Sequence, residues 1–374
     1  MLKGVHLTLL MGPAVPIPAP RMVVDGLTQV QVTSAIERSG FQLTFSVSKQ
    51  SPLLTTLLPA GYFDPMITRV ILIATVNGMP SVLMDGIITR QDLAPSDEPG
   101  QSTLTVTGED LSVLMDVIEF SLPYPGMPAP ARIATILAKY AVFGIIPVVV
   151  PPIFLDMPIP IDRIPVQTGT DLQYIRMLSW QNGHVFYIEP GPAPGANIAY
   201  WGPDIRLPVP QPALNVNMDG HTNVESLSFS LNGLAKKIVI MFAMDPATKK
   251  IPIPVPVPNI SLLRPPLGAR PTLPSRVEVS DDVSKHNPVK ALALALGRTS
   301  ASSDAISGSG QLDVMRYGRV LKARQLVGVR GAGLAYDGLY FVTSVSHSIK
   351  RGEYKQSFNL SRDGLISLTP KVPT

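Results

Sequence analysis

The sequence predicts a mainly β protein with a smaller α/β module, built as two antiparallel β-barrel domains with an inserted α/β segment and a Pro-rich arm. Apolar and polar residues alternate along the first hundred residues and again from Val224, which is typical of half-buried strands. Helical spacing is confined to a stretch near the middle of the chain. With 374 residues, of which 45% are hydrophobic, the chain has enough apolar residues for more than one core.

Residues 1–117 are expected to form the first barrel. The clearest strand is 41–47, where Phe, Leu and Val take one face and Gln, Thr and Ser take the other. Asn77-Gly78 is a tight hairpin signal between two further apolar runs. The expected strands cover residues 5–11, 27–32, 41–47, 70–76, 82–88 and 103–106.

Residues 118–212 have the pattern of a small α/β module. Pro128 and Pro130 introduce apolar residues at helical spacing over 131–142, and a glycine follows. The Thr-Asp-Leu-Gln pattern at 170–173 is a capping box, so a second helix is expected from there to Asn182-Gly183. A strand over 184–188 completes the module.

Residues 213–245 are expected to supply the first strands of the second barrel, as a pair over 224–231 and 238–242 across an Asn232-Gly233 turn. Residues 246–309 then form a Pro-rich arm with a short helix from Asn287-Pro288 to Leu296. Nine prolines lie between 246 and 274, and a run in which every second residue lacks an N–H donor is not a central strand. The arm either packs on its own chain or contacts a neighbour. The rest of the second barrel is expected over 310–374.

The two β regions have a weak internal repeat. Two Asp-Gly pairs begin corresponding strands, and an aspartate follows each pair 25 or 26 residues later. Because element order, spacing and strand pattern agree, we expect two copies of one module, with these residues at its turns. The expected turn residues are Asp85, Gly86, Asp110, Asp337, Gly338 and Asp363. A duplicated module in a trimer would present six nearly equivalent units around an axis.

Composition and motifs favour a protein without catalytic chemistry. The chain has no Cys, and 31 basic against 27 acidic residues leave a net charge of only +4. The five His residues are scattered, no P-loop is present, and Gly308-Ser309-Gly310 is too short for a nucleophile elbow. We therefore expect no catalytic residue, cofactor or metal. The apolar run at 142–155 is too short, and too rich in proline, to cross a membrane.

Basic residues near the C-terminal end form the remaining candidate site. Lys322, Arg324 and Arg330 lie in a region where charges and Tyr residues are interleaved. Charges at period-2 spacing usually face solvent, but in an assembly they could face a channel or a subunit interface. Specific nucleic-acid binding is not expected.

Several segments of the chain resemble the phage late-control D family. They are Gly310-Gln311-Leu312-Asp313, Tyr317-Gly318, Val327-Gly328-Val329, residues 336–347 and Phe358, together with 104–112 and 172–183. None of these strings is diagnostic alone, but together they cover most of the chain. Proteins of this family form the central baseplate hub of contractile phage tails and of contractile injection systems.

The resemblance implies a structural hub with two tube-like barrels per chain. Three chains would form a pseudo-hexameric ring between the hexameric inner tube and a trimeric spike made by a separate chain, with baseplate wedge or LysM-type proteins as further contacts. Such a hub is assembled in the bacterial cytoplasm and becomes part of a virion or an injection particle. Two alternatives stay open, a β-rich virion or secreted protein that binds a receptor or carbohydrate, and a cell-wall hydrolase.

Overall fold

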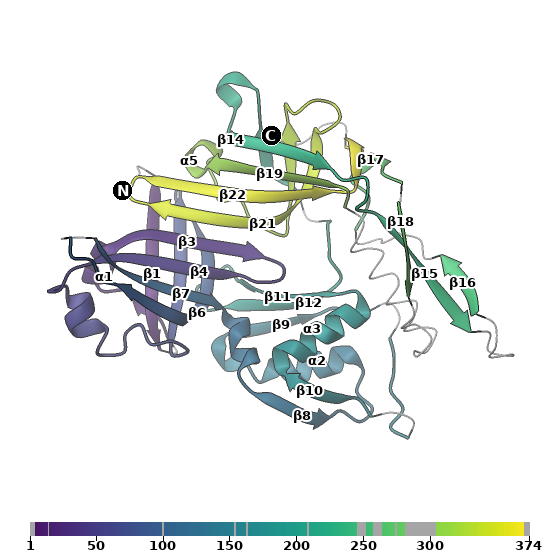
Figure 1. Cartoon of the computed structure of the whole chain (residues 1–374), viewed down its shortest axis with the longest axis horizontal. Coiled ribbons are helices and arrows are strands. Elements are labelled where there is room, and N and C mark those ends of the chain that lie inside the picture. The colour runs from purple at the N-terminus through teal and green to yellow at the C-terminus, as the bar shows by residue number, and fades with distance from the viewer. Residues whose placement is uncertain are drawn as a thin grey trace.

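The fold was analysed in a computed structural model, which describes residues 4–13, 15–98, 101–152, 155–161, 164–207, 209–244, 252–256, 264–273, 275–280 and 304–369. Figure 1 shows the long strands of a large sheet across the upper half of the molecule, an α/β module below them and a small sheet at one side. The expected short helix at 287–296 lies outside the described residues.

The first β module contains all six strands that the alternation predicts. Its elements are β1 (Val5–Pro13), β2 (Ile17–Pro18), α1 (Arg21–Gly26), β3 (Leu27–Ala35), β4 (Gly40–Val47), a π-helical turn (Leu53–Leu57), β5 (Thr68–Val76), β6 (Met79–Ala94) and β7 (Ser102–Asp110). The strands lie in the order β3-β4-β7-β6-β5-β1-β2. The alternating apolar side chains of β4 and β7 face the core, as their period-2 pattern requires.

The α/β module follows the predicted order of helices and strands. It comprises η2 (Leu111–Asp116), β8 (Glu119–Pro123), α2 (Ala129–Ala138), η3 (Ala141–Phe143), β9 (Ile145–Val149), β10 (Val166–Thr170), α3 (Asp171–Asn182), β11 (Val185–Pro190) and β12 (Asn197–Gly202). Thr170 and Gln173 form the expected capping box of α3, and Gly183 ends the helix with φ 63°. The module has its own core, which includes Ile133 and Trp201.

The second β module is interrupted by a separate small sheet. Its elements are β13 (Gln211–Asn215), η4 (Asp219–His221), β14 (Val224–Leu231), β15 (Lys237–Met244), β16 (Pro252–Pro256), β17 (Gly268–Pro271), β18 (Arg276–Ser280), β19 (Ile306–Asp313), α5 (Val314–Tyr317), β20 (Leu326–Arg330), β21 (Gly338–Lys350), β22 (Glu353–Arg362) and β23 (Gly364–Ser367). The main strands lie in the order β14-β19-β22-β21, and β20 pairs with β21 and β13.

The expected pairing of the strands at 224–231 and 238–242 is wrong. β14 pairs with β19, whose Ile306 and Leu312 are buried in the core, whereas β15 lies between β16 and β18 in a three-stranded sheet. The prolines explain part of this arrangement. β16 is an edge strand, where a residue without an N–H interrupts no ladder, so the Pro-rich run is not a central strand, as predicted.

One antiparallel sheet and one core join the two β modules. Residues 344–350 of β21 pair with 29–35 of β3, so that the sheet continues from β14 to β2. The largest hydrophobic cluster takes residues from both modules, among them Phe45 and Leu72 from the first and Tyr340 and Phe358 from the second. The two modules are therefore packed together.

The two modules have the same strand order. In the first, the chain order β3, β4, β5, β6, β7 becomes the sheet order β3-β4-β7-β6-β5, and in the second β14, β19, β20, β21, β22 becomes β14-β19-β22-β21-β20. β-Bulges mark matching places in the two registers. They lie between Leu27 and Gln29 and between Ile88 and Arg90 in the first module, and between Val224 and Ser226 and between Val342 and Ser344 in the second.

A third strand pair checks this alignment independently. If the bulges are superimposed, the pairing of Phe45 with Leu104 between β4 and β7 requires Leu312 to lie opposite Gln356 between β19 and β22. That pairing is observed. The internal repeat expected from the sequence is therefore present in strand order and in register.

The residue alignment expected for the repeat needs correction. When the two modules are aligned on their bulges, Asp85 corresponds to Leu339 and Asp110 to Arg362. The first Asp-Gly pair therefore aligns two residues beyond the second pair, and the two do not correspond. Asp85 and Gly86 lie within β6 rather than in a turn, because β6 begins at the Asn77-Gly78 hairpin and runs through them. Register depends on pairing and bulges, which the turn residues of the sequence do not reveal.

Candidate functional site: an uncharged polar face

The solvent-facing side of the shared sheet is formed almost entirely by hydroxyl and amide side chains. We call it the neutral face. Its residues are Gln29, Gln31 and Thr33 on β3, Gln42, Thr44 and Ser46 on β4, Thr103, Thr105 and Thr107 on β7, Ser226, Ser228 and Ser230 on β14, Ser307, Ser309 and Gln311 on β19, Ser344, Ser346 and Ser348 on β21, and Ser357 and Asn359 on β22. All of them are exposed or half-buried, and their neighbours in each strand point into the core.

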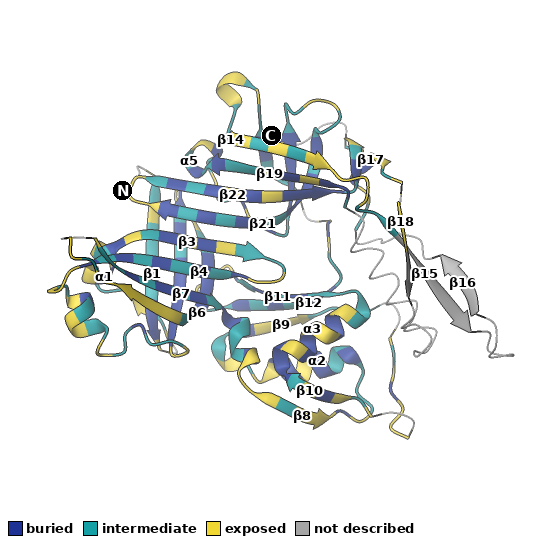
Figure 2. Ribbon diagram, in the orientation of Figure 1, coloured by how far each residue is buried: buried dark blue, intermediate teal, exposed yellow. Residues whose placement is uncertain are grey.

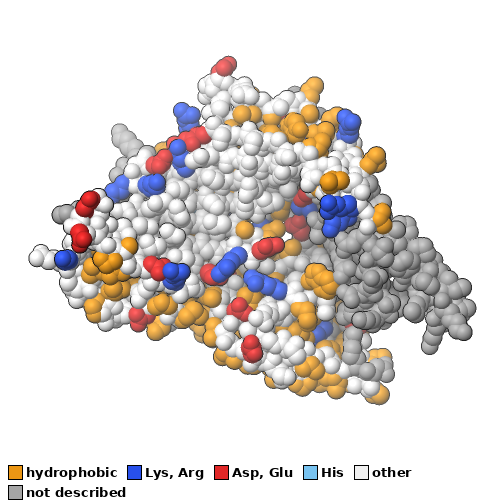
Figure 3. Space-filling model, viewed as in Figure 1, with side chains coloured by type: hydrophobic (Ala, Val, Ile, Leu, Met, Phe, Trp, Pro, Cys, Tyr) orange, Lys and Arg blue, Asp and Glu red, His pale blue; other side chains and the backbone are white. Residues whose placement is uncertain are grey.

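The side chains of the neutral face are linked across strands. The Thr33 and Ser346 hydroxyls lie 3.1 Å apart across the junction between the modules, and Asn359 Nδ2 donates to Ser344 Oγ over 2.9 Å. Figure 3 shows few hydrophobic or charged side chains over the middle of this sheet. A surface of this kind has no fixed charge with which to hold an anionic or cationic polymer.

Charged residues lie at the margins of the neutral face and are mostly paired there. Lys355 contacts Glu225 at 3.1 Å and Glu353 at 3.2 Å, and Arg90 contacts Asp92 at 2.8 Å. Because each pair contains both signs and is partly exposed, it adds little to stability or to the field over the face. The face therefore stays close to electrically neutral.

The first three predicted turn residues make structural contacts. Asp85 is fully buried and accepts two hydrogen bonds of 2.7 Å from Arg69, and Asn197 Nδ2 donates to it over 2.8 Å. Since Arg69 also donates to the Gly195 carbonyl, this ion pair fastens the α/β module to the first β module. Gly86 lies opposite Asp110 in the ladder.

Aspartate side chains do stabilise turns and strand ends elsewhere. Asp110 Oδ1 accepts from Ser112 N over 2.8 Å at the start of η2, and burial raises the pKa of its carboxyl group while these hydrogen bonds oppose the rise. Asp337 accepts from Ala332 N over 2.8 Å in the turn before β21, which begins at Gly338 with φ 124°. Asp363 accepts from the backbone N–H groups of residues 267 and 268. These three carboxylates therefore have structural roles.

The three predicted charges occupy different environments. Arg324 is largely buried: it donates to Glu189 and to the Ala35 carbonyl, and its guanidinium lies 4.5 Å from the Tyr187 ring centroid. It joins the two β modules to the α/β module. Lys322 is exposed and Arg330 is half-buried at the end of β20, so these two remain candidates for a surface contact.

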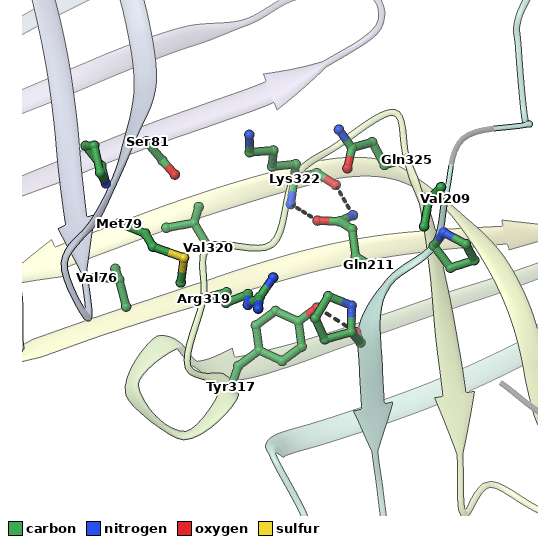
Figure 4. A pocket seen from close by; sticks show the side chains of 13 residues that line it. Val76, Met79, Ser81, Val209, Gln211, Tyr317, Arg319, Val320, Lys322 and Gln325 are labelled. Carbon is green, nitrogen blue, oxygen red and sulfur yellow. Dashed lines mark hydrogen bonds between the residues drawn. The ribbon is translucent and has the colours of Figure 1, made fainter. Parts of the chain in front are cut away.

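A cavity of about 390 Å³ lies beside Lys322, where the β5–β6 hairpin, β13 and the loop after α5 meet. Figure 4 shows Gln211 bonded to both backbone polar groups of Lys322 and the Tyr317 hydroxyl directed to the Pro212 carbonyl. Its walls combine apolar side chains, such as Met79 and Val320, with polar and charged ones, including Arg319 and Lys322. The residues that line it include no nucleophile paired with a base.

Within the described part of the chain, no group of three or more His, Asp or Glu residues is placed to hold a metal ion. Nor does any described helix have the length and apolar character needed to cross a membrane. His347 is buried in hydrogen-bonding distance of the Tyr354 hydroxyl, at 2.8 Å, and burial lowers its pKa to about 4. Gln356 lies beside it and bonds the backbone of Leu321, so this group supports a loop.

The neutral face was not among the predicted site residues. The signal was present, because the polar half of the alternation at 41–47 is Gln42, Thr44 and Ser46. The same uncharged residue types recur in every strand of the face. A search for charged or nucleophilic residues does not detect this pattern, because the residues that recur at every second position are uncharged and polar.

The fold is that of phage tail proteins. The tail protein of Neisseria meningitidis MC58 is 14% identical, with a TM-score of 0.64, over 97% of this chain and 98% of that one. The 43 kDa tail protein of prophage MuSo2 from Shewanella oneidensis is 13% identical, with a TM-score of 0.58, over 96% and 98%. An Escherichia coli component of the type VI secretion system is 10% identical, with a TM-score of 0.54, over 93% of this chain and 75% of that one.

No protein-family model and no curated protein matches the chain in sequence. The similarity is therefore one of structure. It covers nearly the whole of this chain and 98% of each of the two tail proteins, so it includes the β modules and the α/β module together. This agrees with the fold that the late-control D resemblance implies.

Proposed function

We propose that this chain is the structural baseplate hub of a contractile tail or injection system. Three copies would form a ring of six β modules that joins a hexameric inner tube to a separate trimeric spike. The observation that carries this proposal is the duplication: two modules with one strand order and matching bulges share a sheet within one chain. The fold likeness to tail proteins and to a type VI secretion component supports the same role.

The neutral face fits the wall of a central channel. The opposite side of the sheet forms the core, so only this face is available to line a passage. A cargo protein or DNA moving through a hub must not adhere to it, and Ser, Thr and Gln residues supply hydration without fixed charge. In this proposal the hub guides its cargo and performs no catalysis.

The partners in this proposal are a tube protein on one side and a spike protein on the other, with baseplate wedge or LysM-type proteins around the ring. Assembly would take place in the bacterial cytoplasm, before the hub becomes part of a virion or extracellular particle. A carbohydrate-binding role has less support, because Trp201 is fully buried and only Trp180 of the two tryptophans is exposed. The two do not form a stacking platform.

The test is the mass of the purified chain, alone and mixed with tube and spike proteins from the same genome. Light scattering should give three times the 40.2 kDa of one chain, and the trimer should co-elute with the spike. Electron microscopy of the particle should place the ring between tube and spike. A stable monomer at concentrations where the tube protein assembles would contradict the proposal.

A further inference from the structure

The cavity beside Lys322 is built from three segments that meet within one chain. They are the β5–β6 hairpin, the segment that enters β13, and the loop over residues 318–325 between α5 and β20. Its volume of about 390 Å³ lies within the range of ligand-binding cavities. The cavity is therefore large enough to hold a ligand.

The loop between α5 and β20 is fixed from two sides by paired hydrogen bonds. Gln211 Nε2 donates to the Lys322 carbonyl over 2.9 Å, and Gln211 Oε1 accepts from Lys322 N over 2.8 Å. Gln356 makes the same two bonds with the backbone of Leu321, at 2.8 and 2.9 Å. Because this wall of the cavity is already ordered, a ligand that binds there loses little free energy in ordering it.

Two cationic side chains of this loop line the cavity without an acidic partner. Arg319 and Lys322 are both exposed, and Figure 4 shows Arg319 between the side chains of Met79 and Gln211 in this view. Among the described residues, no Asp or Glu lines the cavity or forms an ion pair with either cation. Two unpaired positive charges at the wall of a cavity favour an anionic group inside it.

The cavity also presents apolar surface that the chain leaves uncovered. Met79 is 44% exposed and Val209 is 87% exposed. Pro80, Pro210 and Pro212 add rigid apolar rings and no N–H donor. Figure 2 shows exposed residues in loops, helices and strands alike, so exposure alone does not identify a site. Here, however, exposed apolar residues and unpaired cations line the same cavity.

These features restrict the chemistry of the ligand. A simple anion such as phosphate would leave the apolar surface uncovered, and phosphate sites commonly present backbone N–H groups, which prolines lack. Single-stranded nucleic acid needs aromatic rings on which its bases stack. Tyr317, the one aromatic residue among the described lining residues, is only 8% exposed, and its hydroxyl donates to the Pro212 carbonyl over 2.6 Å. A carboxylate beside an apolar side chain complements both parts of the cavity.

We propose that this cavity binds a short acidic and apolar peptide segment of a partner protein. Carboxylates of the segment contact Arg319 and Lys322 through charge-assisted hydrogen bonds, and a neighbouring apolar side chain packs against Met79. The inference goes beyond the hub function and does not depend on it. The described walls of the cavity all belong to one chain, so the site exists whether or not three chains assemble.

Binding of a defined peptide to the purified chain tests this inference. The probe is a peptide in which Glu or Asp alternates with Leu or Val, with blocked ends and an uncharged dye, and fluorescence anisotropy measures its dissociation constant at low salt. The double variant Arg319→Gln with Lys322→Gln should weaken binding by about tenfold or more, because two charge-assisted contacts are lost. Met79→Gln should weaken it roughly threefold by removing apolar contact.

The matched control is the double variant Lys49→Gln with Lys350→Gln. It removes the same net charge at exposed positions that do not line the cavity. Its dissociation constant should stay within about twofold of that of the natural chain, since charges separated from the ligand by more than a Debye length are largely screened. Thermal unfolding of each variant verifies that it is folded.

The outcomes distinguish the peptide site from other anion sites. Loss of binding in the cavity variant but not in the control, together with no binding of a probe whose acidic residues are replaced by Gln and Asn, supports the inference. A probe with Ser in place of Leu and Val that binds equally well would indicate a simple anion site. An oligothymidylate that binds more tightly than the peptide would indicate a nucleic-acid site. Either result overturns the inference, as do equal losses in both double variants or no binding to the natural chain, and none of them bears on the trimer mass that tests the hub.

Discussion

The two β modules bury different groups at equivalent positions. In the first module, Arg69 and Asp85 form a buried ion pair, whereas the corresponding residues of the second module, Leu326 and Leu339, pack in an apolar cluster. The reverse holds elsewhere: Gln356 in the second module corresponds to buried Leu104 in the first. Arg69 and Asp85 bond to residues 195 and 197 of the α/β module, and Gln356 bonds to the loop at Leu321 within its own module. The duplicated fold therefore tolerates either chemistry, and contacts with neighbouring segments explain which one is present.

The largest expected effect comes from removing one partner of the ion pair. Asp85→Leu leaves the Arg69 guanidinium buried without its carboxylate, so we expect unfolding to become easier by about 3–5 kcal/mol. The double variant Arg69→Leu with Asp85→Leu reproduces the second module and should recover most of that loss. Denaturant unfolding measures both. Asp92→Leu, which breaks an exposed ion pair, is the control and should change stability by less than about 1 kcal/mol.

If the double variant is as unstable as Asp85→Leu, the comparison between the modules is misleading at this position. The contact of Asp85 with Asn197 would then matter more than the charge balance. Limited proteolysis of the α/β module distinguishes the two cases, because loss of that contact alone would loosen this module and leave the shared sheet intact.

The second prediction concerns acid, and it contrasts buried His347 with its apolar counterpart Leu93. The pKa of His347 is lowered by burial to about 4, against 6.5 for the ordinary group. Between these values the unfolded chain binds a proton that the folded chain does not, so stability falls as pH drops from about 6.5 to about 4. The loss is roughly 3 kcal/mol and levels off below that range.

His184 in the α/β module has the same lowered pKa from burial, about 4, and adds to the loss. His347→Gln keeps a hydrogen-bond partner for the Tyr354 hydroxyl but does not titrate. Its unfolding free energy should therefore depend on pH about half as steeply over this range. An unchanged pH dependence in this variant would show that His347 is protonated or solvated in the folded protein.

Much of the fold could be predicted from the sequence, because the signals that predict it are local. Alternation located β4 and β7, and the capping box located α3, because these signals act within a few residues. Long-range pairing was not accessible. β14 and β19 are separated by more than seventy residues, and the nearer β15 was the expected partner. The turn residues misaligned the repeat, since register is fixed by bulges.

The site was predicted less well, because residue type alone does not reveal orientation. Arg324 was expected to face a channel or interface, but it bonds Glu189 and a backbone carbonyl inside the chain. The third prediction uses this contrast. Arg324→Met should cost about 1–3 kcal/mol by removing these hydrogen bonds, whereas Lys322→Met, at an exposed position, should change stability by less than about 0.5 kcal/mol. Thermal unfolding of both variants provides the measurement, and equal effects would contradict the assignment.

The smallest effect on folding is expected at the end of β6, where residues 90–94 pair with β7, whereas the corresponding residues of β21 also pair with β3. Leu93 is 45% exposed, so Leu93→Lys should leave the stability of the isolated chain within about 0.5 kcal/mol. If the proposed ring of three chains closes at this strand, however, that side chain is covered by the next chain, and a buried lysine without a partner opposes the contact. The variant should therefore fold normally and elute as a monomer. Leu334→Lys, at an exposed position in the turn before β21, is the matched control and should still form the trimer. A Leu93→Lys variant that assembles as the natural chain does would show that the ring closes through other surfaces.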